Sequence, residues 1–145
     1  MKFIAQFLLL VVGAGLSQLS AAQTAYPNRP IRLIAPSGAG GPVDVIARIL
    51  AQGWSEVLGE QIVVENRVGA AGLIGADLVA KAMPDGYTLL MGFSGPLAIV
   101  PQLNDATPYD PVRDFAPISL AASAPYVLLV HPSVPAKTVK ELVAL

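Results

Sequence analysis

The stretch from Pro36 to Asp44 reads Pro-Ser-Gly-Ala-Gly-Gly-Pro-Val-Asp and lies between a short apolar run and an amphipathic helical pattern. Three glycines within four positions let the backbone turn sharply and bring its N–H groups close to a ligand. The helix that follows adds unpaired N–H groups and the positive end of its dipole. This pattern predicts a cradle for a carboxylate or a phosphate. The alternative is a tight strand-to-helix turn that binds nothing.

Residues 1–22 have the pattern of a secretory signal peptide. Lys2 precedes an uncharged apolar run, and Ser20 and Ala22 fit the small-residue positions of a cleavage site before Gln23. The apolar run is short for a membrane-spanning helix, so a retained anchor is the weaker alternative. We therefore expect an exported mature chain that begins near Gln23.

Cysteine is absent and histidine occurs once among the 145 residues. In an exported chain this composition excludes a disulfide scaffold and a thiol nucleophile, and it argues against a zinc site. The formal net charge is −1, and the charges are scattered without runs, which argues against nucleic acid and anionic membranes as partners. We expect no cofactor and no metal.

Short apolar runs alternate with helical periods, which is typical of an α/β fold. Strands are expected at residues 31–35, 62–65 and 87–91, and helices at about 43–58 and 74–82. The buried helix faces are expected to hold Val43, Ile46, Ala47, Leu50, Trp54 and Leu58 in the first helix, and Ile74, Leu78, Val79 and Ala82 in the second. Because the connections are helical, the sheet should be parallel.

Ligands of open parallel sheets bind outside the carboxyl ends of the strands. The glycine loop and residues 92–95 should both lie at that edge, because each follows an expected strand. Ser94 can offer a hydroxyl and, with Gly95, N–H donors near a helix start. The alternative is that Ser94 only caps the short helix that follows.

The last third of the chain has less regular patterning. Residues 107–115 read as a loop rich in proline and aspartate, and residues 118–122 and 126–130 as two further strands. Thr138 and Glu141 form a capping box that opens a helix. This helix is short and its apolar stripe lacks an evident partner, so we expect a truncated protein.

A series of short motifs occurs in the order and spacing of one protein family. The motifs are Tyr26-Pro27, Pro30-Ile31-Arg32-Leu33-Ile34, Ala39-Gly40-Gly41 with Asp44, Val64-Glu65-Asn66-Arg67, Gly69 with Gly72, Asp85-Gly86-Tyr87-Thr88-Leu89-Leu90, Tyr109-Asp110-Pro111-Val112 and Asp114-Phe115-Ala116-Pro117. With them, residues 26–145 resemble the periplasmic substrate-binding receptors of tripartite tricarboxylate transporters, also called Bug-type receptors.

The resemblance implies a fold and its division into domains. Such receptors have a two-lobed, periplasmic-binding-protein-like α/β fold of type II-like topology and are roughly twice as long as this chain. By this resemblance residues 1–22 are the signal peptide and residues 23–122 form lobe 1. Residues 123–145 are the crossover strand and the truncated start of lobe 2.

The resemblance also implies a function: a monomeric periplasmic receptor, not an enzyme, captures a small carboxylate and delivers it to the membrane permease subunits of the transporter. The implied ligand-binding residues are Ser37, Ala39, Gly40, Gly41, Asp44, Ser94 and Gly95. An ionised Asp44 next to a bound carboxylate would repel it. We therefore interpret Asp44 as a residue that holds loop N–H groups in place.

Several residues near this site depart from the common family pattern. Ser37-Gly38 stands where many members carry Phe-Pro, Val68 replaces a frequent proline, and Phe93 replaces a small polar residue. These changes leave the identity of the acid open. No basic residue falls in the cradle, and Arg67 is expected to form an ion pair or to face solvent.

Two other functions fit parts of the sequence. Ser94, Asp110 or Asp114, and His131 follow the order of an α/β-hydrolase-like serine esterase, but the glycine two residues after the serine is missing. A dinucleotide-binding domain would explain Gly38, Gly40 and Glu65. Its third glycine, however, falls on Val43.

Overall fold

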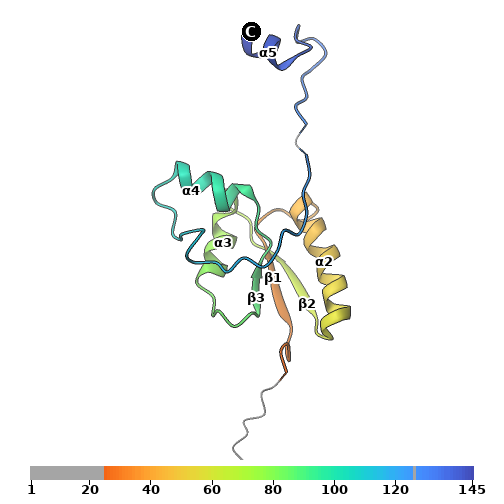
Figure 1. The fold of residues 1–145 in the computed structure, drawn as a ribbon, viewed down its shortest axis with the longest axis vertical. Coiled ribbons are helices and arrows are strands. Elements are labelled where there is room, and N and C mark those ends of the chain that lie inside the picture. Colours follow the sequence, from red (N-terminus) through yellow and green to blue (C-terminus); the bar gives the residue numbers. More distant parts are fainter. Residues whose placement is uncertain (1–24, 126) are drawn as a thin grey trace, which may run out of the picture.

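The computed structural model describes residues 25–125 and 127–145 (Figure 1). The expected signal peptide and its cleavage site between Ala22 and Gln23 lie outside the described residues. The elements, in chain order, are β1 (Ile31–Ala35), α2 (Pro42–Leu58), β2 (Ile62–Asn66), η1 (Ala70–Gly72), α3 (Leu73–Ala80), β3 (Thr88–Leu90), η2 (Gly95–Ile99), α4 (Val100–Leu103) and α5 (Val139–Ala144).

The strands form a three-stranded parallel sheet in the order β2-β1-β3. Leu33 at the centre of β1 lies opposite Val64 of β2 and Leu89 of β3. The prediction of a parallel α/β sheet is confirmed, and the three expected strands are found within one residue of their predicted bounds. The order places α2 and α3 on opposite sides of the sheet (Figure 1).

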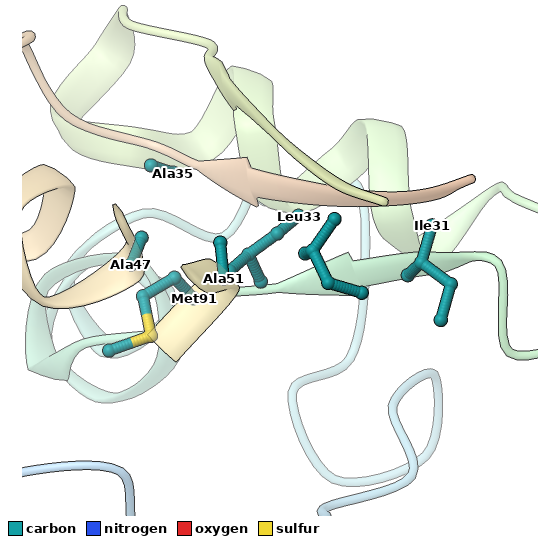
Figure 2. Close-up of a cluster of buried hydrophobic side chains, with 7 residues drawn as sticks. Ile31, Leu33, Ala35, Ala47, Ala51 and Met91 are labelled. Carbon is teal, nitrogen blue, oxygen red and sulfur yellow. The ribbon is translucent and has the colours of Figure 1, made fainter. Parts of the chain in front are cut away.

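The core lies between the sheet and α2. Side chains alternate along β1, so that Ile31, Leu33 and Ala35 share one face. They pack with Ala47 and Ala51 of α2, together with Ile62 and Met91 (Figure 2). Val43, Ile46, Leu50 and Trp54 cover the edge of this cluster and are partly buried. The predicted core face of α2 is therefore confirmed except for Leu58, which is 40% exposed in the last turn.

The ends of α2 follow from its sequence. Pro42 occupies the first turn, where its missing N–H leaves no helical hydrogen bond unmade. Gly59 ends the helix with φ of 72°, a left-handed conformation that favours glycine, and its N–H donates to the carbonyl of Ser55 at 3.1 Å. The chain then turns into β2, where the Ile62 N–H donates to Ser55 Oγ at 2.9 Å.

Helix α3 packs through small residues, and here the predicted buried face is wrong at Ile74, whereas Leu78, Val79 and Ala82 are partly buried. Gly75 and Ala76 are the buried residues of α3, whereas Ile74 is 54% exposed. A Cβ atom at Gly75 would lie 2.7 Å from Pro36 Cβ and 2.9 Å from the carbonyl oxygen of Arg67. Close approach of the helix to Pro36 therefore turns the small side chains inward and Ile74 outward.

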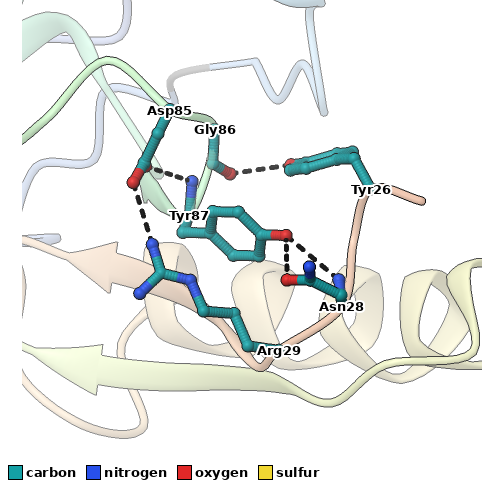
Figure 3. A network of polar contacts seen from close by, with 6 residues as sticks. All are labelled: Tyr26, Asn28, Arg29, Asp85, Gly86 and Tyr87. Atoms are coloured by element: carbon teal, nitrogen blue, oxygen red, sulfur yellow. Dashed lines mark hydrogen bonds and ion pairs between the residues drawn. The ribbon is translucent and has the colours of Figure 1, made fainter. Parts of the chain in front are cut away.

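A cluster at the amino end of the strands fixes the residues before β1; we call Tyr26, Asn28, Arg29, Asp85 and Tyr87 the N-terminal clamp (Figure 3). The Tyr87 hydroxyl donates to Asn28 Oδ1 at 2.8 Å and accepts from the Asn28 N–H at 3.0 Å. Arg29 pairs with Asp85 at 2.8 Å, and its guanidinium lies 4.1 Å from the centre of the Tyr87 ring. The clamp joins the start of the fold to β3.

The two strands predicted after residue 115 are not present. Residues 118–122 and 127–130 form no strand, and in Figure 1 the blue chain runs away from the sheet towards α5. A strand requires a neighbour to pair its N–H and carbonyl groups. Here Leu120 and Leu129 are both 83% exposed, so the extended segment has the composition of a strand without a partner.

The predicted cap by Thr138 at the start of α5 is confirmed, but the Glu141 carboxylate accepts from the residue before the N-cap and not from Thr138 itself. Thr138 Oγ1 accepts from the Glu141 N–H at 3.2 Å, while Glu141 Oε2 accepts from the Lys137 N–H at 2.6 Å. No helix within residues 25–125 and 127–145 has both the length and the apolar character needed to cross a membrane.

Candidate functional site

Three loops meet at the carboxyl edge of the sheet: the glycine loop (residues 36–41), the second loop (residues 67–72) and the third loop (residues 91–95). Gly72 lies between them. A Cβ atom there would be 3.1 Å from Pro96 Cγ, 3.3 Å from Phe93 Cζ and 3.3 Å from the carbonyl oxygen of Pro36. The predicted convergence of the glycine loop with the loop that carries Ser94 is therefore confirmed.

The glycine loop forms a tight turn that depends on its glycines. The Gly41 N–H donates to the carbonyl of Gly38 at 3.2 Å, and Gly40 has φ of 78°. A Cβ atom at Gly41 would lie 3.1 Å from the Gly38 oxygen. Gly38, Ala39 and Gly40 are exposed, so the outer side of this turn is open to a ligand.

Not every amide of this loop is available. The N–H groups of Gly40 and Gly41 already donate within the protein, to Asp44 Oδ2 at 2.8 Å and to the Gly38 carbonyl. In the part of the chain that the structure describes, the amides of Gly38 and Ala39 donate no hydrogen bond. The N–H groups of Gly38 and Ala39 are therefore the loop donors that remain for an anion.

Asp44 is a buried carboxylate, 2% exposed, at the first turn of α2. It accepts hydrogen bonds from Arg48 Nε at 3.0 Å, from the Gly40 N–H at 2.8 Å and from Asn66 Nδ2 at 2.9 Å. Those three donors, Arg48 foremost, lower the pKa of Asp44 to about 2. Asp44 therefore holds a loop N–H group in place, as the sequence interpretation expected.

Arg48 and Asn66 complete this cluster, and the sequence analysis missed both. Arg48 forms an ion pair with Asp44 at 3.0 Å and donates to Asn66 Oδ1 at 3.1 Å. Asn66 Nδ2 also donates to the carbonyl of Ser37 at 3.1 Å. The spacing of four residues between Asp44 and Arg48 on one helix was the available signal for the ion pair.

Ser37 and Ser94 present hydroxyls near the converging loops. Ser37 Oγ is buried and has no hydrogen-bond partner among the described residues. Ser94 is exposed, and its side chain makes no capping bond to η2, so the capping alternative is not observed. Gly95 lies under the Phe93 ring, because a Cβ atom there would be 2.6 Å from Phe93 Cε2.

The cations near the carboxyl edge are paired. Arg67 forms an ion pair with Glu65 at 2.7 Å, one of the two arrangements expected for it, and Arg32 donates to the same carboxylate through two hydrogen bonds of 2.6 and 3.0 Å. Arg32, with a smaller effect from Arg67, lowers the pKa of Glu65 to about 2. Within the described residues no three His, Cys, Asp or Glu side chains gather as a metal site.

The residues of a serine esterase have other partners. His131 Nδ1 lies 2.7 Å from Ser133 Oγ, and Asp110 pairs with Arg113 at 2.7 Å. Asp114 accepts from the Asp110 N–H at 2.7 Å. No hydrogen bond in residues 25–125 or 127–145 joins Ser94 to any of them, so the geometry gives no support to a catalytic triad.

A separate hollow of about 290 Å³ lies at the opposite, amino end of the strands. It is lined by Arg29, Pro30, Arg32, Ala82, Met83, Asp85, Tyr87 and Thr88. Both of its arginines are engaged by carboxylates, Arg29 by Asp85 and Arg32 by Glu65. None of the lining residues is a predicted ligand residue, so the hollow does not coincide with the predicted ligand site.

Comparison with known sequences gives consistent matches. Residues 46–145 match the family described as "Tripartite tricarboxylate transporter family receptor". The chain is 39% identical to Protein BugT of Bordetella pertussis over 144 residues, covering 99% of this chain and 44% of BugT. It is 48% identical over 106 residues to the UPF0065 protein in the tcbD-tcbE intergenic region of Pseudomonas sp., covering 73% of this chain and 31% of that protein. The chain thus spans less than half the length of these curated relatives.

Solved structures share the fold. The structure titled "R. palustris Rpa4515 with adipate" matches with a TM-score of 0.72 and 37% identity, over 82% of this chain and 40% of that one. The structure titled "MatC (Rpa3494) from Rhodopseudomonas palustris with bound malate" matches with a TM-score of 0.64 and 36% identity, over 66% of this chain and 33% of that one. The predicted periplasmic-binding-protein-like α/β fold is confirmed, as one part of a longer fold.

Proposed function

The chain belongs to the family of tripartite tricarboxylate transporter receptors, and on this premise we propose that it is a periplasmic receptor that binds a small carboxylate at the carboxyl edge of its sheet. The observation that carries the proposal is the glycine loop. Its exposed Gly38 and Ala39 amides lie between points fixed by Asp44 and Asn66. Related receptors whose titles name adipate and malate share this fold.

The ligand's carboxylate is held by main-chain donors and hydroxyls rather than by a cation. The proposed donors are the amides of Gly38 and Ala39 and the hydroxyls of Ser37 and Ser94, while Gly40, Gly41 and Gly95 line the site with their backbone. Asp44 does not contact the ligand in this proposal. Its buried carboxylate accepts hydrogen bonds from the Gly40 N–H and from Arg48, and so it positions the loop. Arg48 offsets the charge of Asp44, which lowers the repulsion that an approaching carboxylate would otherwise meet.

The remaining parts of the proposal follow from membership in the family. We propose that residues 1–22 direct export to the periplasm, that residues 23–122 form lobe 1, and that residues 123–145 lead into lobe 2. The full-length receptor is a monomer that delivers its ligand to membrane permease subunits and catalyses no reaction. Which acid it prefers depends on the loops, where Phe93 narrows the space beside Gly95.

A titration monitored by amide NMR spectra tests the proposal. Malate and adipate should shift the amide resonances of Gly38, Ala39 and Ser94, whereas the neutral diamide of adipate should not. Because one lobe covers only one side of the ligand, we expect weak binding by this chain, with a Kd on the order of millimolar. Shifts that spare these amides, or equal shifts with the diamide, would contradict the proposal.

A further inference from the structure

We propose that Asn66 is a positioning residue that sets the glycine loop for its ligand. The side chain of Asn66 leaves the end of β2 and reaches two other parts of the chain. Its Nδ2 donates to the Ser37 carbonyl at 3.1 Å and to Asp44 Oδ1 at 2.9 Å, while its Oδ1 accepts from Arg48 at 3.1 Å. One amide group thus joins the strand, the loop and the helix.

The two ends of the ligand-facing turn are fixed by this arrangement. Asn66 holds the Ser37 carbonyl directly before the turn, and Asp44 holds the Gly40 N–H in its second half. Between these points lie the amides of Gly38 and Ala39, which donate no hydrogen bond to any residue that the structure describes. Fixing both ends orders these donors before a ligand arrives, which reduces the entropy lost on binding.

The chemistry of the site requires an amide at this position. Nδ2 faces two oxygen acceptors and Oδ1 faces a guanidinium donor, so both halves of the group are used. A carboxylate would place an oxygen against the Ser37 carbonyl and against Asp44. A small apolar side chain would leave the Ser37 carbonyl without its donor and remove one of the three donors of the buried Asp44 carboxylate.

Hydrogen exchange of the 145-residue chain tests the role without a ligand. The variant Asn66→Ala should speed exchange about tenfold at the amides of Gly40 and Gly41, which are the hydrogen-bonded amides of the loop, because a lost hydrogen bond changes a local equilibrium by that order. The isosteric variant Asn66→Asp should also speed exchange at these amides, and it replaces Asn66→Ala in the test if that variant does not fold. Asn28→Ala is the matched control, since it removes a similar side-chain bond at the opposite edge of the sheet. It should leave the glycine loop unchanged.

The second measurement is the malate and adipate titration, because the role of Asn66 in binding rests on the proposed function. Asn66→Ala should raise the Kd for malate and adipate, measured from the shifts of the loop amides, about tenfold. Asn28→Ala should leave this Kd unchanged. If neither malate nor adipate shifts the amides of the wild-type chain, the proposed function fails. The hydrogen-exchange experiment still tests whether Asn66 orders the glycine loop. Unchanged loop exchange in Asn66→Ala and Asn66→Asp, or unchanged acid affinity in a responsive protein, overturns the inference.

Discussion

The Gly40 N–H donates to Asp44 Oδ2 at 2.8 Å, so a carboxylate in the first turn of α2 fixes the loop that precedes the helix. Asp44 is four residues further along the chain and is buried. Its other bonds go to Arg48 and Asn66. A negative charge can thus lie beneath a proposed anion site because its oxygens are already paired with donors and with a cation.

The stability of the protein should fall in acid through Asp44 and Glu65. Their folded pKa values are about 2, below the ordinary values of 3.8 and 4.5. A lowered folded pKa means that the unfolded state binds protons first as pH falls. The contribution is therefore complete above about pH 5 and is lost progressively towards about pH 2. Urea unfolding across this range should show the decline.

Charge-removing variants identify the source of that decline. Asp44→Asn should unfold at lower urea concentration at neutral pH, and its stability should depend less steeply on pH between about 5 and 2. Glu65→Gln should behave in the same way through the loss of its bonds to Arg32 and Arg67. If the stability of either variant depends on pH as steeply as that of the wild type, the corresponding carboxylate does not cause the loss of stability in acid.

Gly75 should resist substitution because α3 approaches Pro36 closely at this residue. Gly75→Ala places a Cβ atom 2.7 Å from Pro36 Cβ, and we expect it to lower the free energy of unfolding by about 1–3 kcal/mol. Gly53→Ala is the matched control. Gly53 lies within α2 with no atom within 4 Å of an added Cβ, so the same change should stabilise by about 0.5–1 kcal/mol. Equal effects at both glycines in chemical denaturation would exclude the packing argument.

The sequence predicted most of the sheet because the relevant signals are local. Alternation in β1, the Pro42 and Gly59 ends of α2 and the spacing of its apolar residues depend on neighbours along the chain. The missed features depend on distant contacts. Ile74 is exposed because Pro36 fits only against a glycine, and the bonds of Asn66 to Ser37 and Asp44 span 29 and 22 residues.

The same reasoning explains the wrong strands. Residues 118–122 and 127–130 have β-forming composition, but strand formation also needs a partner edge, which composition does not reveal. The ligand residues remain predictions for a related reason. The meeting of the loops follows from parallel topology, whereas the contacts of a carboxylate depend on which amides the protein has already used.

The N-terminal clamp should contribute to stability through one hydroxyl. Tyr87→Phe removes the group that bonds both the amide and the side chain of Asn28 but keeps the ring beneath Arg29. We expect a loss of about 1 kcal/mol in the free energy of unfolding and faster hydrogen exchange at residues 26–30. Tyr87→Leu should cost more, because it also removes the ring contacts with Arg29 and Tyr26. Equal losses in the two variants would mean that the ring contacts contribute nothing.

The extended segment before α5 should make the protein prone to association. Leu129 is 83% exposed and Val127 is 73% exposed, and an apolar extended segment whose backbone N–H and carbonyl groups are unpaired can pair with other chains. We expect the chain to bind an apolar dye and to form larger species on concentration. Leu129→Glu should reduce both effects, whereas Ala124→Glu, which adds the same charge on the same segment without removing a large apolar side chain, should reduce them less. A wild-type chain that stays monodisperse on concentration and binds no dye would refute this expectation.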